Sequence, residues 1–323
     1  MKSRVVFLGI LITFLTWPVS SPAQQRGPTL ALTLPALEWA LEINAPDFNV
    51  EKRTIAPMGD AVYIFATNKK TNVILSAFLE RTSTKGTPKE WRDNYWNGIK
   101  KNPLKKEQVK MYDSGAIPIM EYMIPEHLGL KVNQKHLHAF LTRENYWVHV
   151  HLSKVLFKAG DEELFQPILG SLRINESYTP TAFDLFQFGN LPFLRKDFQG
   201  AIPYYQKALE LDRKRKTLDR EGWILLVDQL GMSYGLSGDL VKAKELYEWA
   251  ITQEPEYPMF FYNLACTYAE MNKMEEALRN LRLAYKYKRN VLPGQTFPDP
   301  KSDSSFKKYA NNKIFIAELQ KMK

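Results

Sequence analysis

Residues 224–257 read ILLVDQLGMSYGLSGDLVKAKELYEWAITQEPEY, and this stretch decides the fold of the second half of the chain. The next segment, residues 258–291, carries similar residue types at the same positions, 34 residues further along. Small residues recur at positions 8, 20 and 27 of this register, with leucine at position 7 and tyrosine or leucine at position 24. Residues 182–215 repeat the pattern less completely. A fixed period of this length indicates stacked structural units.

Each segment is predicted to be a helix, a tight turn and a second helix. In residues 224–257, Gly231 and Ala243 are small enough to let the two helices approach closely, and Tyr247 would fill the remaining space. Asp239 follows the turn and is the expected N-cap of the second helix. The pattern resembles the tetratricopeptide repeat. The resemblance implies an all-α repeat region at 182–291, with three repeats at 182–215, 224–257 and 258–291.

The repeats depart from the family pattern in two places, and a cap is expected after them. Pro192 lies within the first helix of the first repeat and should kink or shorten it. Residues 216–223 are an insertion between the first two repeats. Residues 292–323 should form a loop and capping helices, because a stack of repeats needs a polar outer side at its end. The last of these helices is expected to turn three residues inward: Ile314, Ile316 and Leu319.

The resemblance implies binding of a partner protein or peptide on the concave face lined by the first helices. The residues expected there are Asp228, Gln229, Met232, Tyr262, Asn263, Cys266 and Glu270. Gln229 and Asn263 occupy the same position one repeat apart, and side-chain amides offer both donors and acceptors to an extended peptide backbone. The alternative is that these two amides only bridge neighbouring helices. The basic residues that grip a terminal carboxylate in clamp-type members are not reproduced.

Residues 1–23 are typical of a secretory signal peptide. Lys2 and Arg4 precede an apolar run, and the small residues Ser21 and Ala23 suit cleavage before Gln24. The apolar run is too short for a membrane span, which takes about 20 residues. We therefore expect an exported protein, periplasmic or secreted, with no transmembrane span after cleavage. The residue directly after the predicted cleavage site is Gln24 and not a cysteine, so a lipoprotein is not expected.

The net charge and the cysteine content bear on the kind of partner and on what stabilises the fold. The formal net charge is +9, but no motif resembles a nucleic-acid-binding one, so no nucleic-acid partner is expected. Cys266 is the only cysteine, and no internal disulfide can form. The stability of the fold must therefore come from packing, which a chain of this length can supply.

Residues 30–174 are predicted to form an α+β domain, an antiparallel sheet with flanking helices, joined to the repeats by a linker at 175–181. Strand-like runs alternate with polar turns, and Thr87, Pro88 and Glu90 announce one helix by a capping box. The segments Trp39–Ile43, Ala45–Phe48 and Leu169–Leu172 resemble parts of the PsbP-like and DcrB-like α+β domains of exported proteins. That resemblance implies no inherited active site.

Four histidines are predicted to gather on one face of a hairpin that turns at Glu144-Asn145. They are His136, His138, His149 and His151, with His138 opposite His151. Imidazole suits zinc and copper, so the face is a possible metal site. The alternative is that histidine is simply a polar residue on a half-exposed face. No carboxylate or thiol lies at close ligand spacing.

The main hypothesis is thus an exported, non-enzymatic interaction scaffold that needs no cofactor. A second hypothesis is an envelope protein that binds zinc or copper through the histidine hairpin. A third is a hydrolase whose site assembles only in space, since the usual local catalytic motifs are missing.

Overall fold

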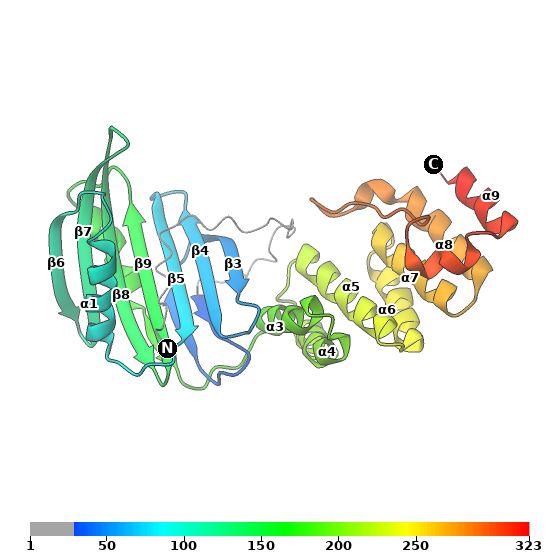
Figure 1. Cartoon of the computed structure of the whole chain (residues 1–323), viewed down its shortest axis with the longest axis horizontal. Coiled ribbons are helices and arrows are strands. Elements are labelled where there is room, and N and C mark those ends of the chain that lie inside the picture. Colours follow the sequence, from blue (N-terminus) through cyan, green and yellow to red (C-terminus); the bar gives the residue numbers. More distant parts are fainter. Residues whose placement is uncertain (1–28, 323) are drawn as a thin grey trace. The chain divides into compact units, whose positions relative to one another are not determined.

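The computed structural model describes residues 29–322, so the predicted signal at 1–23 lies outside the described residues. Within this range the chain forms two compact units, one ending at Thr179 and the other beginning at Pro180. The first unit contains the strands, and the second is built of helices and loops (Figure 1). No helix of residues 29–322 combines the length and the apolar character that crossing a bilayer requires.

The first unit holds two antiparallel sheets, which confirms the predicted α+β class. The small sheet has the order β1-β2-β10, with β1 (Thr29–Leu32), β2 (Ala40–Asn44) and β10 (Arg173–Asn175). The large sheet has the order β3-β4-β5-β9-β8-β7-β6. Its strands are β3 (Asn49–Ile55), β4 (Ala61–Asn68), β5 (Val73–Arg81), β6 (Glu107–Ser114), β7 (Ile117–His127), β8 (Leu130–Arg143) and β9 (Tyr146–Lys154). Strands β1, β3 and β10 were not expected, because they are short or mostly polar.

One face of the large sheet packs against the small sheet and two short helices, η1 (Asp161–Leu164) and α2 (Gln166–Gly170). Leu137, Ala139 and Val150 of strands β8 and β9 contribute to this apolar core, as the hairpin pattern predicted. The hairpin turns at Glu144-Asn145, because Arg143 pairs with Tyr146.

Helix α1 (Pro88–Ile99) covers the opposite face of the large sheet over strands β7 and β8 (Figure 1). It begins with the predicted capping box: Thr87 Oγ1 accepts a hydrogen bond from the amide of Glu90, and the Glu90 carboxylate accepts one from the amide of Thr87. Trp91, Tyr95 and Ile99 pack against a second, smaller apolar cluster on this face. The sheet is therefore covered on both faces over β7 and β8, whereas Phe78 of β5 is 42% exposed.

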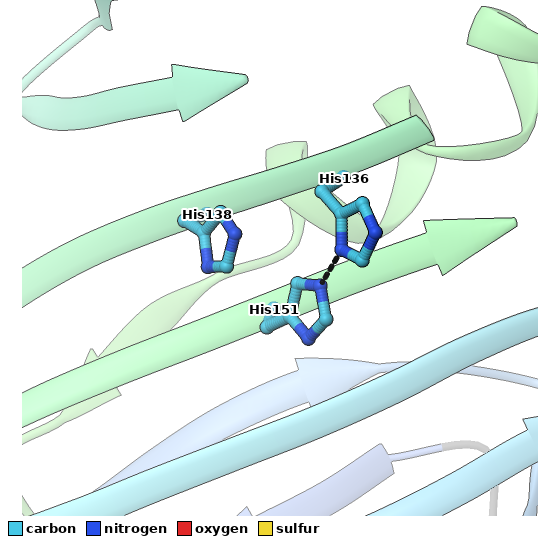
Figure 2. A group of neighbouring side chains, drawn as sticks. All are labelled: His136, His138 and His151. Carbon is cyan, nitrogen blue, oxygen red and sulfur yellow. Dashed lines mark hydrogen bonds between the residues drawn. The ribbon is translucent and has the colours of Figure 1, made fainter. Parts of the chain in front are cut away.

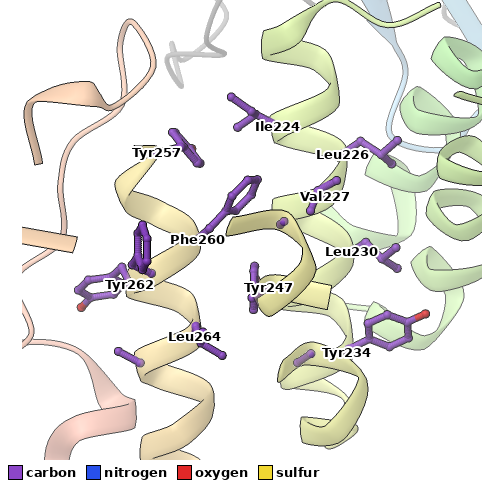
Figure 3. Close-up of a cluster of buried hydrophobic side chains, with 14 of the residues drawn as sticks. Ile224, Leu226, Val227, Leu230, Tyr234, Tyr247, Tyr257, Phe260, Tyr262 and Leu264 are labelled. Atoms are coloured by element: carbon purple, nitrogen blue, oxygen red, sulfur yellow. The ribbon is translucent and has the colours of Figure 1, made fainter. Parts of the chain in front are cut away.

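The second unit is a run of helical hairpins, as the 34-residue register predicted. Its long helices are α3 (Ala182–Leu194), α4 (Phe198–Lys214), α5 (Arg220–Leu236), α6 (Leu240–Gln253), α7 (Pro258–Glu270) and α8 (Met274–Lys286). Asp197 and Asp239 cap α4 and α6 through side-chain hydrogen bonds to backbone amides. Leu230, Tyr247 and Leu264 belong to one buried core shared by α5, α6 and α7 (Figure 3).

The small residue at position 8 is required by the bulky residue at position 24. A Cβ atom on Gly231 would lie 2.7 Å from the Cε1 and the hydroxyl oxygen of Tyr247. Gly189 and Tyr205 meet in the same way in the first repeat. In the third repeat position 8 is alanine instead of glycine, and position 24 is leucine (Leu281) instead of tyrosine. The larger residue at position 8 is thus matched by a smaller one at position 24.

The structure places the two departures from the repeat pattern. Pro192 lies inside α3, which is 13 residues long like α7 and shorter than the 17-residue α5; the predicted kink stays a prediction. The last four residues of the insertion 216–223 are the first turn of α5. The rest is a tight loop, in which Asp212 Oδ1 accepts hydrogen bonds from the amides of Thr217 and Leu218.

The C-terminal segment caps the array, but two of the three side chains predicted to face inward do not. After the short helix η2 (Lys288–Asn290), helices η3 (Ser304–Tyr309) and α9 (Lys313–Lys321) follow. Phe306 and Phe315 are buried in the repeat core, whereas Ile314 is 64% exposed and Ile316 is 38% exposed. The prediction of inward isoleucines was wrong because a spacing of two does not share a helical face, whereas Phe315 and Leu319, four apart, do.

Candidate functional site

The helix-A surface is the surface formed by the first helices of the three repeats, α3, α5 and α7. All seven residues predicted to bind a peptide are on two of these helices. Asp228, Gln229 and Met232 belong to α5, and Tyr262, Asn263, Cys266 and Glu270 belong to α7. The structure brings them together along two neighbouring helices, and it also shows which of them already have partners inside the protein.

Asp228 and Asn263 bind each other across the second and third repeats. The Asn263 Nδ2 group donates a hydrogen bond of 2.6 Å to Asp228 Oδ1. Burial raises the pKa of the Asp228 carboxyl to about 7, although the hydrogen bond from Asn263 acts in the opposite direction. The bridging role that was the alternative for Asn263 is therefore present, and its contact with a peptide stays a prediction.

Gln229 also bridges neighbouring repeats. The Tyr205 hydroxyl lies 2.7 Å from Gln229 Oε1 and 2.8 Å from Asn190 Oδ1. A hydroxyl has a single hydrogen, so it can donate to only one of these two oxygens at a time. Among the described residues no hydrogen bond engages the side-chain nitrogen of either amide. Both amides therefore keep donors to offer to a ligand.

The surface of the third repeat is covered by the protein's own C-terminal segment. The Tyr262 hydroxyl donates to Asp303 Oδ2 at 3.0 Å, and the Cys266 thiol lies 3.7 Å from the same oxygen. Lys308 forms an ion pair with Glu270 at 3.3 Å. Burial, with Asp303 nearby, raises the pKa of the Cys266 thiol well above its usual value. This thiol is therefore protonated and packed rather than reactive.

Sequence reasoning missed three residues of this surface. Asn190 occupies position 9 of the first repeat, the position of Met232 and Cys266 in the next two, so the register could have identified it. Tyr205 was recognised only as a filler, but its hydroxyl reaches two amides. Asp303 lies outside the register, and no local signal connects it with α7.

The four histidines lie where the hairpin register placed them, but their surroundings differ from the expected half-exposed face. His138 pairs with His151, and Phe140 pairs with His149. Tyr95 of helix α1 lies over the rings of His138 and His149, with centroid separations of 5.2 and 4.7 Å. His138 is 1% exposed, whereas His136, His149 and His151 stay partly exposed. Helix α1 therefore covers the middle of the face, which sequence periodicity did not predict.

Burial determines the charge of these histidines. Desolvation, followed by repulsion from neighbouring imidazoles, lowers the pKa of His136 and His149 to about 3, and desolvation lowers that of His151 to about 4. The pKa of His138 falls well below its usual value for the same reasons. All four rings are neutral at pH 7, which is the form that ligates metals.

Comparison with known proteins supports the repeat assignment. Residues 186–215 and 260–291 match the family described as tetratricopeptide repeat. These two segments fall within the first and third repeats of the register. No curated protein matches this chain. Arrays of this kind are generally non-enzymatic scaffolds for protein interactions, and the family needs no cofactor as a rule.

Several solved structures are similar to this chain. One is YrrB, a tetratricopeptide repeat protein with an unusual peptide-binding site, at 22% identity and a TM-score of 0.31; the match covers 40% of this chain and 60% of YrrB. A second is the repeat domain of Sgt2 from Aspergillus fumigatus, at 20% identity, a TM-score of 0.32, and coverage of 44% and 82%. A third is SycD, a type III secretion translocator chaperone from Yersinia enterocolitica, at 18% identity and a TM-score of 0.31. The match covers 46% of this chain and 96% of SycD.

Proposed function

Because the C-terminal region carries tetratricopeptide repeats, we propose that the chain is an exported, non-enzymatic scaffold that holds a partner peptide. The peptide would lie in extended form on the helix-A surface of the first two repeats. Export rests on the sequence of residues 1–23. The observation that carries the rest is the contrast along this surface: the third repeat is covered by residues of the chain's own C-terminal segment, and the first two keep polar and apolar groups available.

The polar groups are the side-chain amides of Asn190 and Gln229. Their nitrogens have no partner among the described residues, and both are linked to the Tyr205 hydroxyl, which holds them in place. An extended peptide presents a carbonyl every residue, and amide nitrogens are suitable donors to it. These two side chains come from adjacent repeats, so together they can bind successive carbonyls.

The apolar groups are two leucines at position 13 of their repeats. Leu194 is 71% exposed and Leu236 is 58% exposed. The equivalent residue of the third repeat is Glu270, which is paired with Lys308. Burying one exposed leucine against a partner contributes about 1.5–3 kcal/mol. We therefore expect the partner peptide to carry apolar side chains, and not to depend on a terminal carboxylate.

A displayed peptide library, selected on the mature chain, tests this proposal. Selected peptides are then titrated by fluorescence anisotropy against the wild type and two matched variants. Leu236→Ser removes an exposed apolar group of the helix-A surface, and Val241→Ser removes one of similar exposure, 56%, from helix α6. We expect Leu236→Ser to weaken binding by about tenfold, which is about 1.4 kcal/mol, and Val241→Ser to leave it unchanged. Failure to select any peptide, or equal effects of both variants, would refute the proposal.

The individual role of Gln229 is tested in the same titration. Gln229→Ala removes the amide but also the bond to Tyr205, so Tyr205→Phe is the control: it removes the hydroxyl and its contacts with Gln229 and Asn190 but keeps both amides. Weaker binding by Gln229→Ala than by Tyr205→Phe assigns the amide to peptide contact. Equal affinities would restrict Gln229 to bridging its neighbours.

A further inference from the structure

The histidine cluster is defined here as His136, His138, His149 and His151, four of the five histidines of the chain. It lies in the first unit, between the large sheet and helix α1, and takes no part in the proposed peptide binding. Buried histidines are usually accounted for by hydrogen bonds to other protein groups. In this cluster the imidazoles bond chiefly to one another.

Two imidazole pairs make up the cluster. His136 Nδ1 lies 2.9 Å from His151 Nε2, and the two ring planes differ by 1° (Figure 2). The centroids of these rings are 5.2 Å apart, so the rings meet edge to edge in one plane. His138 Nδ1 and His149 Nε2 are also 2.9 Å apart. Each pair shares one proton between two nitrogens.

The pairs stack on each other and leave one buried nitrogen without a partner. The rings of His138 and His151 are 4.3 Å apart and differ by 9° in orientation, so the second pair lies against the first. His136 Nε2 is buried and has no hydrogen-bond partner. An unpartnered buried polar atom costs about 1–3 kcal/mol.

From this geometry we propose that His136, His138 and His151 bind a late first-row transition metal ion, Cu²⁺ more tightly than Zn²⁺. Each of the three residues offers one nitrogen, and these nitrogens all lie within 4.8 Å of one another. Two nitrogens that bind one zinc ion are roughly 3.3 Å apart in tetrahedral geometry. Closing the site therefore requires the nitrogens to approach by about 1.5 Å and the His138 ring to rotate, because a metal lies in the plane of each imidazole and the rings of His138 and His151 are stacked. The metal takes the position of the proton shared by His136 Nδ1 and His151 Nε2, and the ring that donated this proton carries it on its other nitrogen instead.

The ligand type determines the kind of metal. The group contains nitrogen ligands only, which suit copper and zinc, whereas calcium and magnesium require oxygen ligands. For a given set of nitrogen ligands Cu²⁺ binds more tightly than Zn²⁺. His149 is outside the group of three, but its hydrogen bond to His138 Nδ1 orients the His138 ring. The other nitrogen of that ring, Nε2, lies 3.3 Å from the Tyr122 hydroxyl.

The experiment is a titration of the tag-free mature chain with Cu²⁺ and with Zn²⁺, each in competition with a chelator of known affinity. We expect one ion per chain with a Kd below about 1 µM, and tighter binding of Cu²⁺. A Kd weaker than about 100 µM for both ions, or more than one site of equal affinity, overturns the proposal. Electron paramagnetic resonance of the copper form should show coupling to nitrogen nuclei, and a spectrum with oxygen ligands alone would contradict it.

Variants locate the site. His136→Gln and His151→Gln should each weaken binding at least tenfold, because each removes a ligand. His127→Gln changes the exposed fifth histidine and should have no effect. If His127→Gln abolishes binding while the other two variants retain it, the ion is at the surface and the proposal fails. Far-UV circular dichroism checks that each variant is folded, and the wild-type titration remains decisive if one of them is not.

Discussion

Replacing Gly231 by alanine tests the packing on which the repeat assignment rests. The new Cβ would lie 2.7 Å from the Cε1 and hydroxyl oxygen of Tyr247, well inside the 3.5–4.0 Å at which such atoms attract. The ring has little room to move, because Tyr247 is 1% exposed and its hydroxyl donates to the backbone oxygen of Asp228. The clash must be relieved by shifting helix α5 away from α6.

Two effects of opposite sign set the magnitude. Overpacking of a filled core costs typically about 1–3 kcal/mol. Alanine in a helix interior is favoured over glycine by about 1 kcal/mol. Because the approaches are to a buried ring that cannot move aside, the cost should fall in the upper part of that range, about 2–3 kcal/mol, and we expect Gly231→Ala to lower the free energy of unfolding by about 1–2 kcal/mol. Gly235→Ala is the matched control on the same helix, since its Cβ would meet only the Cβ of Ala243, at 3.9 Å. That variant should be as stable as the wild type or more so.

Urea unfolding followed by circular dichroism at 222 nm measures both variants, because most of the helical signal comes from the repeat unit. A double variant, Gly231→Ala with Tyr247→Leu, reproduces the combination that the third repeat uses at Ala265 and Leu281. It should be more stable than the sum of its single effects implies. The reasoning is refuted if Gly231→Ala is as stable as the wild type, or if Gly235→Ala loses as much.

Two further predictions concern the repeat unit. Burial raises the pKa of Asp228 to about 7 in the folded protein, so the folded state retains a proton that the unfolded chain releases above about 4, and stability falls as the pH rises from about 4 to about 7. This increase in the pKa of Asp228 lowers the free energy of unfolding at pH 8 by at most about 4 kcal/mol. Asp228→Asn cannot titrate, so its urea midpoint should change less between pH 5 and pH 8 than that of the wild type; parallel changes would contradict this. Phe315→Ala should cost about 3–5 kcal/mol and Ile314→Ala less than about 0.5, as thermal unfolding would show, because Phe315 is 2% exposed and Ile314 is 64% exposed. A larger loss of stability for Ile314→Ala than for Phe315→Ala would mean that the isoleucines, and not Phe315, face the core.

The helix-A surface shows how far a register can locate a binding site. It placed Gln229 and Asn263 on neighbouring helices, and it would have added Asn190 at position 9. It could not show that Tyr262 and Cys266 contact Asp303, since the C-terminal segment has no place in a 34-residue period. The first two repeats could be identified as the open part of the helix-A surface only after the structure had shown that the C-terminal segment covers the third repeat.

Most helices and strands of this protein could be predicted from local sequence patterns; strands β1, β3 and β10 could not. The spacing of small and bulky residues predicted the helical hairpins, and alternation with a turn at Glu144-Asn145 predicted the pairing of His138 with His151. Local rules suffice for these features, because helix and strand periods are set by the backbone and by contacts between near neighbours. The capping box of α1 follows from the same rules.

Only the tertiary structure decided what covers each face. Nothing in residues 135–153 shows that helix α1 covers His138, and nothing in the repeats shows that Asp303 contacts the end of the helix-A surface. Such contacts join segments distant in sequence, and they depend on which apolar surfaces remain to be buried after the local elements have formed. Burial in turn gives His138 and Asp228 their altered pKa values, because the cost of a charge depends on the whole surrounding fold rather than on sequence neighbours.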